Sequence, residues 1–146
     1  MSRRVLFDSS AYVQALRERR VELLQSRTYD GAFVHLSAVV ACELLAGAKN
    51  PRSRRELERL WSDFDRAGRL VVPVAEDWYD AGVVLSQIAA KYGHEQIGQA
   101  RLVHDTIIAL SARRHGISVV TLNRAHFDLV SEFRPVRILL PNETLS

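Results

Sequence analysis

Cysteine is almost missing from this chain, because Cys42 is the only one among its 146 residues. No disulfide can therefore form within the chain, and a zinc site built from several cysteine thiolates is excluded. The chain also lacks any run that approaches the roughly 18 apolar residues of a membrane span, since Glu43 interrupts its most apolar stretch, residues 35–48. These absences predict a globular protein that does not enter a membrane.

Several targeting and catalytic signatures are absent as well. The amino terminus, MSRRVLFD, reaches Asp8 after three apolar residues, so we expect no secretory signal peptide and a reduced, cytoplasmic location. Neither a Walker A motif nor G-x-G-x-x-G occurs, so no nucleotide cofactor is expected. Without a G-x-S-x-G elbow, and with Cys42 in apolar helical sequence, a serine or cysteine nucleophile is disfavoured.

Lysine is scarce, and arginine supplies most of the positive charge. Of 20 basic residues 18 are Arg and two are Lys; against 17 Asp and Glu, the net charge is +3. Guanidinium groups bind phosphates through two parallel hydrogen bonds, so an Arg-rich surface suits nucleic acid, although a genomic bias towards Arg codons produces the same ratio. The arginine clusters at positions 17, 19 and 20 and at 52, 54, 55 and 59 fit either a nucleic-acid footprint or solvated helix faces.

Short apolar segments alternate with longer helical ones, and no linker divides them, so we expect a single domain over residues 1–146. Strands are expected at residues 4–8, 33–36, 70–74, 117–122 and 136–140, and helices at 10–26, 38–48, 51–68, 76–92 and 102–115. Strands rich in Val, Ile and Leu that alternate with helices are typical of a parallel sheet covered on both faces. The predicted fold is an α/β three-layer sandwich with a central, mainly parallel sheet of about four to five strands.

Local signals support two of these helices. Ser37 and Asn50 are expected N-caps, and Pro51 follows Asn50 at the first helical position. The helix after Pro51 carries an apolar stripe at helical spacing, which predicts either core packing or a dimer surface. Its members are Leu57, Leu60, Trp61 and Phe64.

Three acids from distant segments are expected at one edge of the sheet. Asp8 ends the first strand, Glu43 lies among apolar residues in the helix after the second strand, and Asp105 lies near the start of the helix over residues 102–115. Ligands of such sheets bind beyond the carboxyl ends of the strands, where these helices begin. Each acid also has an ordinary interpretation: a turn or N-cap for Asp8, an Arg partner for Glu43, and helix-dipole stabilisation for Asp105.

The segment TLNRAHFDL adds polar residues at the same edge. Thr121 and Asn123 end the strand at residues 117–122, and His126 and Asp128 follow. Asn123 suits a neutral oxygen ligand or a water holder. His126 fits either the site or a turn packed on Phe127, and the direction of Asp128 stays open.

Three close carboxylates repel one another and raise each other's pKa unless a cation neutralises them. Mg²⁺ or Mn²⁺ takes oxygen ligands and keeps waters for a phosphate substrate. This donor set therefore favours hydrolysis of a phosphodiester by an activated water.

The segments VLFDSSAYV, LSAVVACELLAGA and RLVHDTIIALSARRHGISVVTLN make the chain resemble a PIN-domain ribonuclease, most of all the VapC toxins of toxin–antitoxin pairs. The resemblance covers nearly the whole chain. It implies a Mg²⁺- or Mn²⁺-dependent endoribonuclease, the toxin of a type II module, that is held inactive by a VapB-type antitoxin. It also implies a homodimer, with the stripe on residues 51–68 as a candidate dimer surface.

By position, the resemblance assigns Asp8, Glu43 and Asp105 as metal-binding acids. Further polar positions match at Ser9, Ser37 and Thr121. The family often has a fourth acid in T-x-D or T-x-N followed by D-F; here Asn123 fills the first place and His126 stands where the second Asp is common. The resemblance then favours one metal ion, with Asn123 orienting water or substrate and Glu43 holding water or acting as base.

Two other functions are compatible with the same residues. The first is a PIN-like module that binds RNA or a partner after its site has weakened. The second is a phosphatase with Asp8 as nucleophile, although such enzymes usually carry a second Asp two residues on, where this chain has Ser10. RNA sequence preference would depend on loops near residues 28–33 and 93–99.

Overall fold

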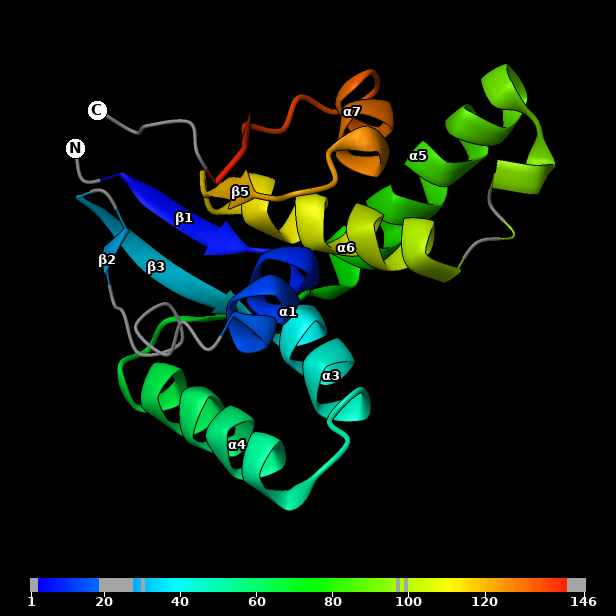
Figure 1. The fold of residues 1–146 in the computed structure, drawn as a ribbon. Coiled ribbons are helices and arrows are strands. Elements are labelled where there is room, and N and C mark those ends of the chain that lie inside the picture. Colours follow the sequence, from blue (N-terminus) through cyan, green and yellow to red (C-terminus); the bar gives the residue numbers. More distant parts are fainter. Residues whose placement is uncertain (1–2, 19–27, 30, 97, 99, 142–146) are drawn as a thin grey trace.

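The computed structural model describes residues 3–18, 28–29, 31–96, 98 and 100–141. Within these ranges one sheet contains the strands β1 (Arg4–Phe7), β2 (Thr28–Tyr29), β3 (Ala32–Ser37), β4 (Leu70–Val71), β5 (Ser118–Val120) and β6 (Ile138–Leu139). The helices are α1 (Ser9–Arg17), α3 (Ala38–Ala46), α4 (Pro51–Arg66), α5 (Ala75–Tyr92), α6 (Ala100–Arg114) and α7 (Ala125–Ser131), with a short 3-10 helix η1 (His94–Gln96) (Figure 1).

The sheet is built outward from β1. This strand pairs in parallel with β3 on one side and with β5 on the other. β4 continues in parallel beyond β3, β6 continues in parallel beyond β5, and the short β2 pairs antiparallel with the start of β3. The expected mainly parallel sheet is confirmed, and the carboxyl ends of β1, β3 and β5 meet at one edge.

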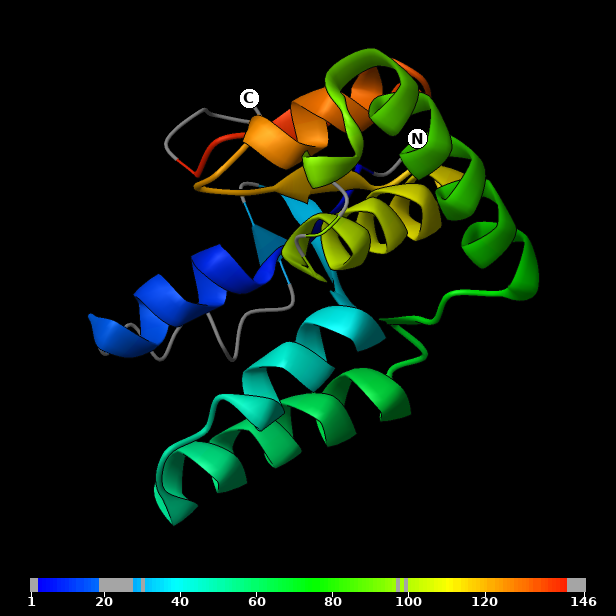
Figure 2. The ribbon, with the colours of Figure 1, turned by 90° about the vertical axis from the view of Figure 1, so that its right-hand side faces the viewer.

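The central strands are buried on both faces. Val5, Leu6 and Phe7 of β1 and Val119 and Val120 of β5 are at most 1% exposed. Such strands need a helical layer on each side because both rows of apolar side chains must leave water. Figure 2 shows α1 on one side of the sheet and α5 on the other, which gives the three layers that the sequence predicts.

The apolar stripe on α4 belongs to the core. Leu57, Leu60 and Phe64 are buried, and Trp61 is partly buried and packs against them. The start of this helix is capped as expected, since the side chain of Asn50 accepts a hydrogen bond from the Ser53 amide at 2.9 Å. Among the described helices, none is long and apolar enough to cross a membrane.

Several boundaries differ from the prediction. The strand expected at residues 70–74 is only two residues long, because Pro73 lacks the amide hydrogen that a ladder requires. The elements β2, η1 and α7 were not predicted, since each is too short for a periodic pattern. The helix expected over residues 10–26 begins at Ser9, and residues 19–26 lie outside the described ranges, as do Arg19 and Arg20. α6 begins at Ala100, which moves Asp105 from the first helical turn to the second.

Candidate active site

Asp8 lies directly beyond β1 and is 2% exposed. Its Oδ1 atom accepts hydrogen bonds from the Ser10 hydroxyl at 2.6 Å and from the Ala11 amide at 3.2 Å, so Asp8 is the N-cap of α1. Its Oδ2 atom accepts from the Thr121 hydroxyl at 2.5 Å. The ordinary N-cap interpretation is therefore correct, while Asp8 also lies at the carboxyl edge of the sheet.

Thr121 connects Asp8 to the loop after β5. Its hydroxyl, which donates to Asp8, accepts from the Asn123 amide at 3.0 Å, and the Leu122 amide donates to Ser10 Oγ at 3.2 Å. Thr121 is fully buried, whereas Asn123 is exposed. These bonds hold the backbone around Asn123 beside Asp8, with the Asn123 side chain open to solvent.

Asp105 lies in α6 and is 4% exposed. Its Oδ2 atom accepts a hydrogen bond from His126 Nδ1 of α7 at 2.8 Å. Burial raises the pKa of Asp105; the hydrogen bond and charge of His126 oppose that rise, and the negative charge of Asp8 adds to it. The effect of Asp8 means that these two carboxylates lie close enough to repel each other.

Glu43 projects from α3 with 20% of its side chain exposed. Its Oε2 atom lies 3.7 Å from His104 Nδ1, while its Oε1 atom is buried without a hydrogen-bond partner among the described residues. Burial raises the pKa of Glu43, and the charge of Asp105 raises it further, against the opposing effects of His104 and Arg101. A buried carboxylate oxygen without a donor is costly, so this atom is suited to meet a cation.

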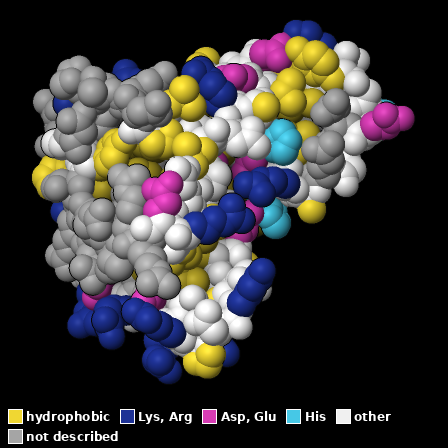
Figure 3. Space-filling model, in the orientation of Figure 1, with side chains coloured by type: hydrophobic (Ala, Val, Ile, Leu, Met, Phe, Trp, Pro, Cys, Tyr) yellow, Lys and Arg dark blue, Asp and Glu magenta, His cyan; other side chains and the backbone are white. Residues whose placement is uncertain are grey.

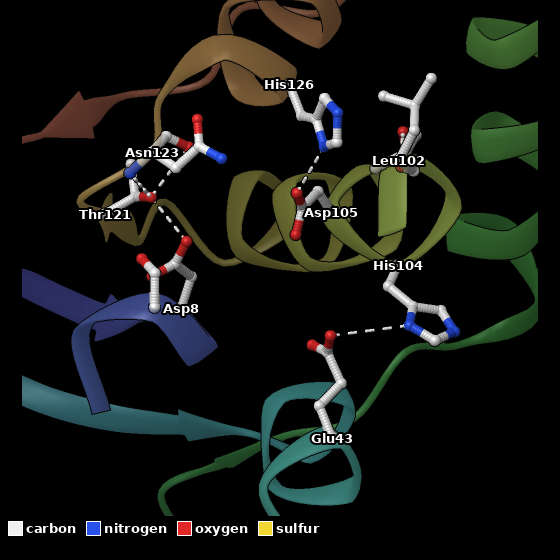
Figure 4. A network of polar contacts seen from close by, with 10 residues as sticks. Asp8, Glu43, Leu102, His104, Asp105, Thr121, Asn123 and His126 are labelled. Carbon is white, nitrogen blue, oxygen red and sulfur yellow. Dashed lines mark hydrogen bonds and ion pairs between the residues drawn. The ribbon is translucent and has the colours of Figure 1, made fainter. Parts of the chain in front are cut away.

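The three acids come from the end of β1, from α3 and from α6, and they face a common space in Figure 4. Acidic side chains lie among Lys, Arg and His side chains at the centre of the face in Figure 3. Within the described ranges, however, no three His, Cys, Asp or Glu side chains converge closely enough to form a ready-made metal cage. Mg²⁺ usually binds to proteins through one or two carboxylates and keeps several of its waters. The carboxylate oxygens of the three acids therefore fit a hydrated ion.

Three further polar residues predicted for the site differ in what they contact. Ser9 is buried and lines the same cavity as Glu43. Ser37 is buried but caps α3, where its hydroxyl accepts from the Val40 amide at 3.4 Å. Asp128 is exposed on α7 and pairs with Arg124 at 3.2 Å.

A cavity of about 530 Å³ extends from Glu43 between α1, α3 and the start of α4. Three exposed basic residues line it: Arg17, Lys49 and Arg101. A larger cavity of about 920 Å³ between α3 and α4 is lined mostly by apolar side chains, with Cys42 and Trp61 among them, and its lining includes none of the three acids. Of these two, the smaller and more polar cavity, called the polar cavity below, is the one lined by one of the acids, Glu43.

Sequence reasoning missed three residues at this site: Ser10, Arg101 and His104. Arg101 and His104 lie four and one residues before Asp105. The fourfold spacing places Arg101 on the same face of α6 as Asp105, which is a signal that the sequence does contain. No such signal in the sequence marks His104, because its distance from Glu43 depends on how α3 crosses α6.

Comparisons with known proteins agree with this architecture. A sequence model of the PIN domain matches residues 5–132, whereas a comparison with curated protein sequences found no significant match. FitAcB from Neisseria gonorrhoeae is 26% identical with a TM-score of 0.59, over 94% of this chain and 97% of that one. DNA-bound VapBC from Salmonella typhimurium is 20% identical with a TM-score of 0.59, over 97% and 99%. VapBC2 from Rickettsia felis, bound to a DNA fragment from its promoter, is 17% identical with a TM-score of 0.60, over 94% and 98%.

The resemblance noted in the sequence is thereby confirmed at the level of the family. The matched segment contains the three acids and, apart from Arg4 at the start of β1, every strand up to β5. The chain belongs to the PIN domain family.

Proposed function

We propose that this chain is a Mg²⁺- or Mn²⁺-dependent endoribonuclease. PIN domains are a family of nucleases, which supports hydrolysis of a phosphodiester. The observation that carries the proposal is Glu43 Oε1, which is buried without a hydrogen-bond partner among the described residues. The negative charge of Asp105 raises the pKa of Glu43, and the negative charge of Asp8 raises the pKa of Asp105. Such an arrangement is unfavourable for folding alone, because it brings negative charges together without full compensation.

Each residue has a distinct role in this proposal. A divalent ion held by Asp8, Glu43 and Asp105 would neutralise their repulsion, activate a water for attack and stabilise the leaving oxygen. Ser10 and Thr121 hold Asp8 in one orientation. Glu43 Oε1, which has no hydrogen-bond partner among the described residues, would hold the attacking water beside the ion and accept its proton.

The polar cavity next to Glu43 fits the path of an RNA backbone. Arg17, Lys49 and Arg101 supply positive charge along its length. The backbone amide of Asn123 is bonded to Thr121, and its exposed side chain would orient water or substrate. Binding through phosphates releases counterions, so we expect affinity for RNA to fall with rising salt concentration.

We further propose that the chain is the toxin of a type II toxin–antitoxin module, with an antitoxin of the VapB type as partner. Support comes from the similar folds of the VapBC and FitAcB structures and from the sequence motifs of the VapC toxins. A cytoplasmic location, a homodimer and a single domain over residues 1–146 belong to the same proposal. The exposed Val72, Trp78 and Tyr79 are candidates for the dimer contact.

The direct experiment measures cleavage of structured RNA by the purified chain with Mg²⁺ or Mn²⁺, and again with EDTA. Asp8→Asn is the informative variant, because asparagine still caps a helix but removes the charge. We expect EDTA to abolish cleavage and Asp8→Asn to reduce it by about 100-fold or more. Asp128→Asn is the matched control, since this exposed acid is paired with Arg124 and should leave cleavage unchanged.

Other outcomes separate the alternatives. Cleavage that persists in EDTA and in Asp8→Asn would contradict the proposal. A gel shift with RNA but no cleavage by the wild-type chain would favour the binding module, and a phosphorylated Asp8 would favour the phosphatase.

A further inference from the structure

Hydrogen bonds already occupy several oxygens of the three acids. Both oxygens of Asp8 accept hydrogen bonds, from Ser10 and the Ala11 amide on one side and from Thr121 on the other. Asp105 accepts from His126 through Oδ2. Each aspartate therefore has an orientation that its neighbours impose before any ligand arrives.

The packing of α7 against the core holds His126 in place. It lies on α7, and the next residue, Phe127, is 0% exposed, as is Val130 one turn later. These two side chains anchor α7 against the core, so the backbone of His126 cannot move freely. Its imidazole is 17% exposed and its Nδ1 atom lies 2.8 Å from Asp105 Oδ2.

The direction of the contact decides which oxygen of Asp105 remains available. In Figure 4, His126 approaches Asp105 from the side opposite to Glu43, and the second carboxylate oxygen points towards the space shared with Asp8 and Glu43. An imidazole N–H that donates to a carboxylate fixes the plane of that carboxylate. Rotation of Asp105 would break this bond in a site that is almost fully buried.

We propose that His126 is a positioning residue that holds Asp105 Oδ2 and leaves Oδ1 as the single oxygen this acid offers to a divalent ion. The inference rests on the proposed function, because it assumes that Asp105 is a ligand. It goes further by assigning His126, for which the sequence left both a site role and a turn role open.

His104 provides a natural comparison. Its Nδ1 atom is 3.7 Å from Glu43 Oε2, beyond hydrogen-bond distance, and its side chain is 49% exposed. An exposed imidazole at this distance places little constraint on Glu43. His104 still lies at the site, so the matched control for loss of an imidazole is His94, which is exposed on η1 away from the three acids.

The experiment measures Mn²⁺ binding to the full chain by electron paramagnetic resonance and calorimetry, with cleavage kinetics alongside. His126→Leu replaces the imidazole donor with an apolar side chain, whereas His126→Asn keeps an N–H near the position of Nδ1. We expect His126→Leu to bind Mn²⁺ about 10–100-fold more weakly and to lower kcat with little change in KM. His126→Asn should recover most of this loss, and His94→Leu should resemble the wild type.

The outcomes distinguish this inference from the proposed function. If the wild type binds one Mn²⁺ and the folded His126→Leu variant binds it equally well, His126 has only a structural role and the inference is wrong. If the wild type binds no Mn²⁺ at all, the proposed function itself fails. Thermal unfolding without metal confirms that each variant is folded at the assay temperature.

Discussion

Asp8 illustrates how one residue serves both the fold and the site. Its Oδ1 atom caps α1, and its Oδ2 atom accepts from Thr121 across the sheet edge. The two interpretations of this aspartate, structural cap and site acid, are therefore compatible. A cap at the end of a central strand fixes the carboxylate more firmly than an exposed loop would, because backbone and side-chain donors both act on it.

The clearest prediction for a single residue concerns Thr121. Thr121→Val keeps the shape of a fully buried side chain but removes the hydroxyl that bonds Asp8 and the Asn123 amide. We expect the free energy of unfolding, measured with urea in EDTA, to fall by about 1–3 kcal/mol, since buried polar groups lose their partner. Thr121→Ser keeps the hydroxyl and should lose much less. Equal losses in both variants would assign the effect to packing.

Among the secondary-structure elements, the positions at which α3 and α6 begin determine where Glu43 and Asp105 lie. α3 begins directly after β3 and carries Glu43 in its second turn, and Ser37 defines its first residue through the bond to the Val40 amide. This helix end was predictable, because a serine before an apolar helical segment is a local signal. The start of α6 was not, since no capping residue marks Ala100 in the sequence.

Ser37 tests whether a polar residue near the site is structural. Ser37→Ala removes the cap, so we expect a loss of about 1 kcal/mol in the free energy of unfolding, measured with urea. RNA cleavage should remain unchanged at a temperature where the variant is folded, because the hydroxyl of Ser37 bonds to the first turn of its own helix. Ser37→Thr keeps a hydroxyl and serves as the control. A folded Ser37→Ala variant with at least about tenfold slower cleavage would instead place Ser37 in the reaction, as the family resemblance implies.

Charge is unevenly distributed over the whole molecule. The acids gather at the carboxyl ends of the strands, whereas Arg4 lies at the amino end of β1 and, with Arg69 and His115, surrounds the half-buried His35 of β3. Burial, followed by the effects of Arg4, Arg69 and His115, lowers the pKa of His35 from 6.5 to about 4. His35 is therefore neutral in the folded protein at neutral pH.

This shift predicts how stability depends on pH. Between pH 6.5 and about 4 the unfolded chain binds a proton at His35 that the folded chain does not, so the stability present above pH 6.5 is lost as the pH falls. Because solvent screens charge at a half-buried side chain, we expect a contribution of order 1 kcal/mol. Urea unfolding across this range should show a weaker pH dependence in His35→Gln than in the wild type. The same substitution at the exposed His94 is the control, and parallel curves for wild type and His35→Gln would disprove the role of His35.

Local patterns in the sequence were enough to predict the class of fold, the mainly parallel sheet and the caps of α3 and α4, and to propose the three acids. These features follow from local patterns: apolar strands, helical spacing, and acids placed where strands end and helices begin. Short elements such as β2, β4 and α7 depend on contacts with distant segments, so no local pattern specified their bounds. The hydrogen bond between Asp8 and Thr121 and the contact between His126 and Asp105 could not be predicted in this way. Nor could the burial of Glu43 Oε1 without a hydrogen-bond partner among the described residues. The physical reason is that these contacts join residues up to 113 positions apart, and their geometry depends on how helices cross the sheet edge.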